Sequence, residues 1–164
     1  MIEIKPDSPF FSIENVRFLF DTSNIVFLAG SIEMGLAENW QKKVVDKLIN
    51  TDIIILNPRR DNWDASWEQS TSNPEFVEQV KWELAGINLA DKVLFYFDPA
   101  TKSPISLMEL GLCIGKMAFG RVSNVFVCCP EGYWKKGNVD ILCEKYGVKV
   151  YSDLNQMLLD GFVA

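Results

Sequence analysis

The chain has 164 residues, of which 48% are hydrophobic and 23% charged, and it contains no histidine. This length fits a single domain whose core is large enough to need no disulfide or metal for stability. The absence of histidine excludes an imidazole general base, nucleophiles activated by histidine and zinc sites that use it. If the protein is an enzyme, carboxylates, Tyr, Lys or Cys must move its protons.

The net charge limits the classes of partner. Sixteen basic and twenty-two acidic side chains give a net charge of −6, and the basic residues form isolated pairs such as Arg59–Arg60 and Lys135–Lys136. Binding to a nucleic acid polymer normally needs a basic stripe, so such a polymer is not an expected partner. The sequence shows neither a signal-peptide pattern nor an apolar run of membrane-spanning length, so no membrane partner is expected. Four cysteines without CxxC spacing predict buried free thiols and a cytoplasmic location.

The first half of the chain alternates apolar runs with helical periods. Residues 25–29 are a short apolar run that predicts a buried strand, and residues 37–48 have the spacing of an amphipathic helix. A second strand is predicted over 52–56. A long loop over about 59–72 follows, and long ordered loops often carry function. The next helix begins at Asn73–Pro74, a cap followed by proline at the first helical position.

The second half continues the same alternation. In chain order it predicts a strand over 92–97, a helix from Ser103 or Ser106 to about 117, a strand over 124–128, a helix over 139–146, a strand over 148–151 and a last helix from about 154. Strands that are apolar on both faces, between amphipathic helices, indicate a parallel sheet covered on both sides. The expected architecture is a single domain over residues 1–164, with a doubly wound α/β fold of five parallel strands. Residues 1–24 would be an N-terminal extension, in which 16–20 could add an edge strand.

Polar side chains follow the carboxyl ends of the first three predicted strands. Gly30 and Ser31 follow the first strand, Asp61 lies beyond the second, and Asp98 and then Ser103 follow the third. In doubly wound folds ligands bind beyond these strand ends, so we expect the five residues to lie near one site. Serines near helix N-termini usually cap the helix, although backbone amides at such a place also hold phosphate.

Two glutamates lie on faces of helices that are otherwise apolar. Glu109 shares its face with Ile105 and Cys113, and Glu83 shares its face with Val80. A carboxylate in such a place is costly to ionise unless it has partners. Two structural alternatives stand beside a functional role: a capping box that pairs Ser106 with Glu109, and a salt bridge of Glu83 at the edge of the core. Paired carboxylates cleave glycosidic bonds without histidine, which favours a functional role for both.

Four segments carry a family pattern: Phe27–Ile32 (FLAGSI), Leu56–Asp64 (LNPRRDNWD), Ala90–Asp91 and Ser103–Gly111 (SPISLMELG). Together they resemble the nucleoside 2-deoxyribosyltransferase family, over about residues 25–150. The resemblance implies a flavodoxin-like fold and the exchange of the base on a 2′-deoxynucleoside. The implied partners are a small nucleoside or nucleotide and a free nucleobase.

The resemblance also implies roles for individual residues. Glu109 would be the nucleophile that forms a covalent deoxyribosyl intermediate, which the incoming base resolves. Glu83 would assist protonation of the base or orientation of the sugar. Asp61 and Trp63 would line the base side, although Trp63 could instead pack the loop. Asn138 resembles an asparagine that reaches into a neighbouring subunit's site to hold the sugar, which implies a homo-oligomer with shared active sites.

Two positions depart from the better-known transferases. Ser103 stands six residues before Glu109, where those enzymes carry Asp, and Phe27 stands where they carry Tyr. Together with Gly30–Ser31, Ser103 resembles the related deoxynucleoside 5′-monophosphate N-glycosidases, in which serines hold the phosphate. The alternatives are therefore hydrolysis of a deoxynucleoside 5′-monophosphate, or a non-catalytic domain that binds or senses nucleotides. No cofactor and no metal are expected.

Overall fold

In the part of the chain that the structure describes, the sheet is a single layer of six parallel strands. The computed structural model describes residues 1–8, 13–16, 24–32, 37–60, 66–120 and 124–162. The strands lie side by side in the order β1-β3-β2-β4-β5-β6, and every neighbouring pair is parallel. Their bounds are β1 Ile2–Ile4, β2 Ile25–Gly30, β3 Ile54–Leu56, β4 Lys92–Tyr96, β5 Asn124–Cys128 and β6 Val150–Tyr151.

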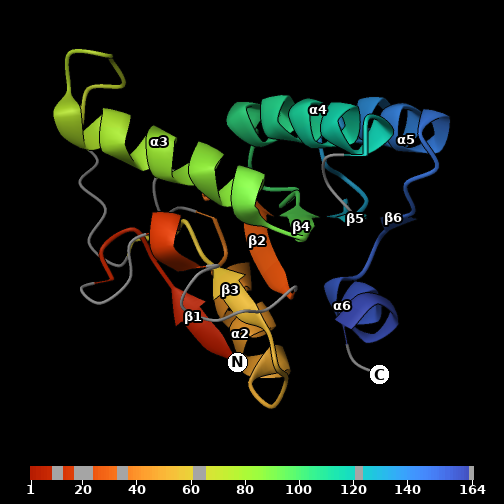
Figure 1. Cartoon of the computed structure of the whole chain (residues 1–164). Helices are drawn as coiled ribbons and strands as arrows, with labels where there is room; N and C mark the ends of the chain where they lie inside the picture. The colour runs from red at the N-terminus through yellow and green to blue at the C-terminus, as the bar shows by residue number, and fades with distance from the viewer. Residues whose placement is uncertain (9–12, 17–23, 33–36, 61–65, 121–123, 163–164) are drawn as a thin grey trace.

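Helices cover both faces of this sheet. Figure 1 shows α3, α4 and α5 on one face and α2 and α6 on the other. The bounds are α2 Trp40–Leu48, α3 Pro74–Leu89, α4 Pro104–Ala118, α5 Lys136–Lys145 and α6 Leu154–Phe162, and a short 3-10 helix, η1, spans Ile13–Asn15. The predicted doubly wound α/β fold is therefore confirmed. Without β1, the strand order is the 2-1-3-4-5 order of flavodoxin-like folds, as the family resemblance implied.

The predicted count of five strands was wrong by one. The sixth strand, β1, pairs with the outer side of β3, where Ile2 lies opposite Ile54 and Ile4 opposite Leu56. Three residues are too few to show a hydrophobic period, so the pattern did not indicate it. The edge strand predicted over 16–20 lies outside the described residues except for Val16, which is buried next to η1.

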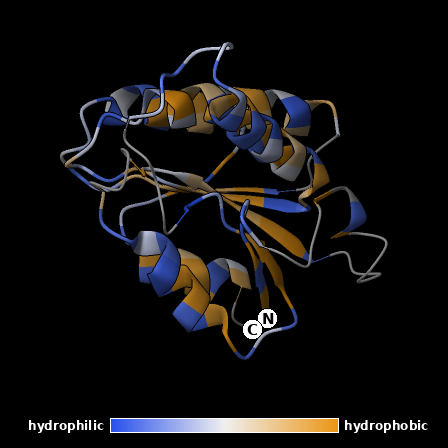
Figure 2. Cartoon of the chain, turned by 90° about the vertical axis from the view of Figure 1, so that its left-hand side faces the viewer, coloured by the Kyte–Doolittle hydropathy of each residue, from blue (hydrophilic) through white to orange (hydrophobic). Residues whose placement is uncertain are grey.

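The strands alternate their side chains between two hydrophobic cores. In β2, Phe27 and Ala29 point to the core under α3, α4 and α5, whereas Val26 and Leu28 point to the core under α2 and α6. Figure 2 shows the apolar strands between helices whose outer surfaces are hydrophilic. This double burial explains why the central strands are apolar at consecutive positions.

Two glycines permit close approaches on which the layers depend. A Cβ at Gly30, where φ is +141°, would lie 2.2 Å from the Tyr96 carbonyl oxygen, so only glycine lets β2 end against β4. A Cβ at Gly86 in α3 would lie 2.6 Å from the Phe27 ring, so this glycine sets the distance between α3 and the sheet. Gly111, in the exposed part of α4, has no such neighbour within 4 Å.

The two helical glycines give opposite predictions for stability. Gly86→Ala is expected to lower the free energy of unfolding by about 1–3 kcal/mol, because the new methyl group overlaps the Phe27 ring. Gly111→Ala is expected to raise it by about 0.5–1 kcal/mol, because alanine favours the helix and open space surrounds it. Urea denaturation of both variants measures these changes. Two changes of the same sign would contradict the packing of α3 on Phe27.

Candidate functional site

The site lies where β2 and β4 end side by side, which is the point where the strand order reverses. The backbone N–H of Ser31 donates to the Tyr96 carbonyl across this boundary, at 2.9 Å. Loops that leave the two strands in opposite directions open a crevice at such a point. The N-terminus of α4 lies over the same edge, because α4 follows β4 after a short loop.

Three buried hydroxyls, the hydroxyl cluster, join these elements. The Oγ atoms of Ser31 and Ser103 are 2.6 Å apart, and Thr101 Oγ1 lies 2.8 Å from each. The backbone N–H of Asp98 also donates to Ser31 Oγ, at 2.9 Å. Ser103 adopts a left-handed conformation, with φ at 45°, directly before Pro104. The cluster thus fixes the start of α4 against the end of β2.

A cavity of about 450 Å³ opens beside this cluster, between the strand ends, α3 and α4. Its walls are mostly apolar. Among the described residues, the titratable side chains that line it are those of Glu83 and Glu109. The lining residues are Phe27, Ala29, Gly30, Ile32, Pro58, Gln69, Phe76, Gln79, Val80, Glu83, Leu84, Ser103, Pro104, Ile105, Ser106, Met108 and Glu109. The volume lies within the range of about 300–1,000 Å³ that is usual for small-molecule sites.

Glu109 enters the cavity from the second turn of α4. The helix begins at Pro104 with Ser103 as its N-cap, so the alternative of a capping box between Ser106 and Glu109 was wrong. Glu109 is 8% exposed, and no hydrogen bond to its carboxyl occurs among the described residues. Burial first, and the charge of Glu83 second, raise the pKa of Glu109 to about 8. This shift favours the protonated form of Glu109 at neutral pH.

Glu83 enters the same cavity from α3 and has a different environment. Its Oε1 accepts a hydrogen bond from Gln79 Nε2 at 2.8 Å. Burial raises the pKa of Glu83, while the Gln79 hydrogen bond and the charge of Arg60 act in the opposite direction. The alternative of a salt bridge is not seen, because the partner of Glu83 within the described ranges is this amide and not a cation. The two inward glutamates thus lie together but are stabilised differently.

The other residues predicted for the site differ in whether they line the cavity. Gly30 and Ser103 line the cavity, whereas Ser31 lies behind Ser103 in the hydroxyl cluster. Asp98 does not line the cavity; its carboxylate accepts the backbone N–H groups of Glu38 at 3.2 Å and Ala100 at 2.9 Å, so it holds the loops. Asp61 and Trp63 lie outside the described residues.

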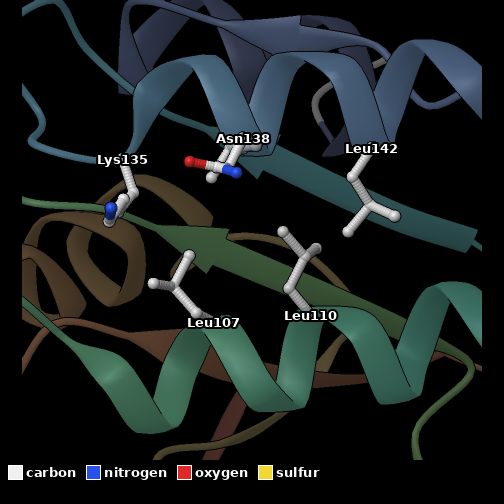
Figure 3. Close-up of a pocket in the computed structure, with 6 residues that line it drawn as sticks. Leu107, Leu110, Lys135, Asn138 and Leu142 are labelled. Carbon is white, nitrogen blue, oxygen red and sulfur yellow. The ribbon is translucent and has the colours of Figure 1, made fainter.

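Asn138 lines another hollow. It extends from α5 toward Leu107 and Leu110 of α4, as Figure 3 shows, in a space of about 320 Å³. Leu107 and Leu110 lie on the side of α4 away from the cavity, whereas Glu109 faces into it. Asn138 therefore does not join Glu109 within one chain.

Three further residues of the site were not predicted as site residues from the sequence. Thr101 closes the hydroxyl cluster, Gln79 bonds Glu83, and Ser106 is buried in the cavity wall. Gln79 stands four residues before Glu83, which is the spacing of neighbours on one helix face, so this signal was present in the sequence. Thr101 had no such signal, because only the meeting of β2 and β4 brings it to Ser31.

The geometry and the family comparison agree. A doubly wound α/β domain with a cavity at the strand ends, lined by two carboxyls, has the arrangement of a small-molecule site. The chain matches the family model described as "Nucleoside 2-deoxyribosyltransferase like" over residues 23–133, and it belongs to that family. A comparison with curated proteins found no match. Within the described ranges, no helix has both the length and the apolar character needed to cross a membrane.

The raised pKa of Glu109 predicts a stability that depends on pH. The folded-state pKa of about 8 exceeds the ordinary value of 4.5, so the folded protein binds this proton more tightly and loses stability as pH rises from 4.5 through 8. At pH 9, the free energy of unfolding of Glu109→Gln is expected to exceed that of the wild type by about 2–4 kcal/mol. At pH 4 the two proteins are expected to differ by less than about 0.5 kcal/mol. Equal differences at pH 4 and pH 9, measured by denaturant unfolding, would contradict burial of an ionising Glu109.

Proposed function

We propose that this protein transfers a 2′-deoxyribosyl group between nucleobases through an ester on Glu109. The observation that carries the proposal is the pair of carboxyls, Glu109 and Glu83, in one largely apolar cavity at the strand ends. The family match supports the same class of reaction. The chain thus has a nucleophile and a proton carrier without histidine, and the apolar walls suit a flat base.

The proposed resting pair carries one proton. In the first half-reaction the C1′–N bond breaks, a bond forms between a Glu109 carboxyl oxygen and C1′, and the proton of the pair passes through Glu83 to the departing base. In the second half-reaction a ring nitrogen of the incoming base attacks C1′, the ester bond breaks, and the proton of that base returns to the pair. Two displacements at C1′ retain its configuration.

Charge favours a neutral nucleoside as the substrate. The part of the cavity wall that the structure describes contains two glutamates and neither lysine nor arginine. A substrate with a 5′-phosphate would bring negative charge toward these carboxyls, and Arg60, the cation that faces Glu83, does not line the described part of the cavity. A free nucleoside avoids this repulsion, and its 5′-hydroxyl suits the hydroxyl cluster as a hydrogen-bond partner.

The hydroxyl cluster supports hydrolysis of a deoxynucleoside 5′-monophosphate as the second candidate. Ser31, Thr101 and Ser103 gather next to the first turn of α4, where backbone N–H groups and hydroxyls together suit a phosphate. Water would then replace the incoming base in the second step. A non-catalytic nucleotide-binding domain is disfavoured, because Glu109 is buried with no hydrogen-bond donor among the described residues, and a chemical role accounts for the cost of that burial.

A product assay tests the transfer. Deoxyinosine with free adenine is expected to yield deoxyadenosine and hypoxanthine, and Glu109→Ala is expected to lower the rate by about 10³-fold or more, since the covalent route is lost. Mass spectrometry of the protein with deoxyinosine alone should show a deoxyribosyl adduct on the peptide that contains Glu109. The rate should fall as pH rises through about 8, because the pair then loses the proton that the base needs.

Parallel incubations separate the candidates. Free base released only from deoxynucleoside monophosphates would select the hydrolase. No reaction with either substrate class, or full activity in Glu109→Ala, would overturn the proposed mechanism. Glu78→Gln, which removes a carboxylate from the exposed side of α3, is the matched control and should keep wild-type activity.

We also propose a homo-oligomer with shared sites in a reducing compartment such as the cytoplasm. Ile105, Met108 and Leu112 form an exposed apolar row on α4 beside the cavity, which suits a second copy of the chain. Asn138 lies away from the Glu109 of its own chain, as a residue that serves a neighbour would. The four cysteines are free and buried, which suits a reducing compartment.

Mixing two inactive variants tests the shared site. Glu109→Ala and Asn138→Ala are each expected to be impaired alone. If Asn138 serves the neighbouring site, a 1:1 mixture re-associated from subunits should regain about a quarter of wild-type activity, because half of the dimers hold one complete site of two. Activity equal to the mean of the two parents would contradict the sharing of sites. Light scattering of the wild type gives the oligomeric state.

A further inference from the structure

The side-chain amide of Gln79 is completely occupied. It is 2% exposed, at the base of the cavity in the first half of α3. Its Nε2 donates to the Pro58 carbonyl at 3.0 Å and to Glu83 Oε1 at 2.8 Å. Its Oε1 accepts from Arg60 Nε at 2.6 Å. An amide has two N–H groups and one carbonyl oxygen, and each of these has a partner here.

These partners leave the amide only one orientation. If it flipped, its oxygen would face the Pro58 carbonyl and its N–H groups would face the Arg60 guanidinium, so both contacts would become repulsive. Gln79 therefore presents an N–H, and never its oxygen, to Glu83. An N–H donor stabilises a carboxylate more than a protonated carboxyl. The guanidinium of Arg60, which also lies over the Trp67 ring at 5.5 Å, holds the donor in this orientation.

We propose that Gln79, oriented by Arg60, is a positioning residue that keeps the negative charge of the carboxyl pair on Glu83 and the proton on Glu109. This inference rests on the proposed function. It assigns a task to two residues whose hydrogen bonds run to other protein groups rather than into the cavity. Their effect reaches the reaction through Glu83.

The charged and titratable groups around the pair support this assignment. Arg60, from the loop after β3, faces Glu83, and Cys113, one turn further along α4, is the titratable group near Glu109. Burial raises the pKa of the Cys113 thiol to about 12, so it remains neutral and does not compete for the charge. Within the described part of the chain, Glu83 alone of the two carboxyls has a hydrogen-bond donor, so it ionises first.

The assignment explains how two carboxyls divide the work. When the proton moves from Glu109 to Glu83, Glu109 becomes the nucleophilic carboxylate and Glu83 becomes an acid. Because Gln79 and Arg60 disfavour the protonated form of Glu83, this acid is strong and releases its proton readily to the departing base. Without Gln79 the proton would remain on Glu83, and transfer to the base would be slower.

A titration of Glu83 tests the inference directly. In protein labelled with ¹³C at glutamate carboxyls, Glu83→Gln identifies the Glu83 signal by its loss. Gln79→Glu keeps the size and the contact with Arg60 but replaces the N–H donor by a carboxyl oxygen. The Glu83 midpoint is expected to rise by about one pH unit or more. For the reaction, kcat should fall by roughly tenfold with little change in KM, and its pH profile should shift in the same direction.

The chain contains a matched control on the other face of the sheet. Gln156 Nε2 donates to Asp160 Oδ1 at 2.6 Å, also over one helical turn, but this pair is exposed. Gln156→Glu makes the same chemical change there, and water replaces the lost donor. It should leave the Glu83 midpoint and kcat unchanged. Gln79→Met adds no charge and is the second variant in case the buried extra carboxyl of Gln79→Glu unfolds the protein. It also lacks the N–H donor, so it should raise the Glu83 midpoint as well.

The outcomes separate the two proposals. If the wild type neither transfers nor hydrolyses but the Glu83 midpoint still depends on Gln79, the proposed function is wrong and the placement of charge stands. If the wild type is active and the Glu83 midpoint is the same in wild type, Gln79→Met and Gln79→Glu, the role of Gln79 is overturned. Arg60→Met, which frees the amide to flip, should raise the Glu83 midpoint by a smaller amount, and no change would remove Arg60 from the assignment.

Discussion

The close contact between the ends of β2 and β4 is the constraint on which the site depends. Gly30 lets the backbone of β2 pass the Tyr96 carbonyl at a distance that any side chain would prevent. The next residue, Ser31, bonds the same carbonyl and then gathers Thr101 and Ser103 around its hydroxyl. Because these bonds fix the start of α4, they also fix the depth at which the second turn of that helix enters the cavity.

Burial raises the pKa values of both glutamates, and it also lowers the stability of the fold when they ionise. Glu109 lies in an apolar wall without a donor in the described part of the chain, while Glu83 receives the Gln79 amide. In surroundings of such low polarity, this difference in donors has a large effect on how readily each carboxyl ionises, and the electrostatic interaction between the two carboxyls is stronger than in water. A cavity built in this way trades stability for a pair of carboxyls in different environments. Enzymes that act on glycosidic bonds use such pairs to divide the tasks of nucleophile and acid.

Much of the architecture was predictable because it depends on local patterns. Five strands and the helices between them follow from apolar runs and helical spacing, and the inward positions of Glu83 and Glu109 follow from the faces of their helices. β1 was not predictable, since three residues show no period and its stability comes from pairing with β3. The contacts of Asp98 were not predictable for a related reason: its place after a strand suggested a ligand contact, whereas its carboxylate accepts hydrogen bonds from the backbone N–H groups of Glu38 and Ala100, which only the fold brings to it.

The sequence by itself determined the class of fold, the absence of imidazole chemistry and the two glutamates on apolar faces. These properties depend on composition and on spacing along single elements, so they need no knowledge of which elements meet. The tertiary structure alone decided that Glu83 and Glu109 share one cavity, that Ser31 and Thr101 form a hydrogen bond although they are 70 positions apart in the sequence, and that Gln79 lies between Arg60 and Glu83 and bonds both. Such contacts join side chains from different strands and helices, and their chemistry exists only at the distances that packing sets.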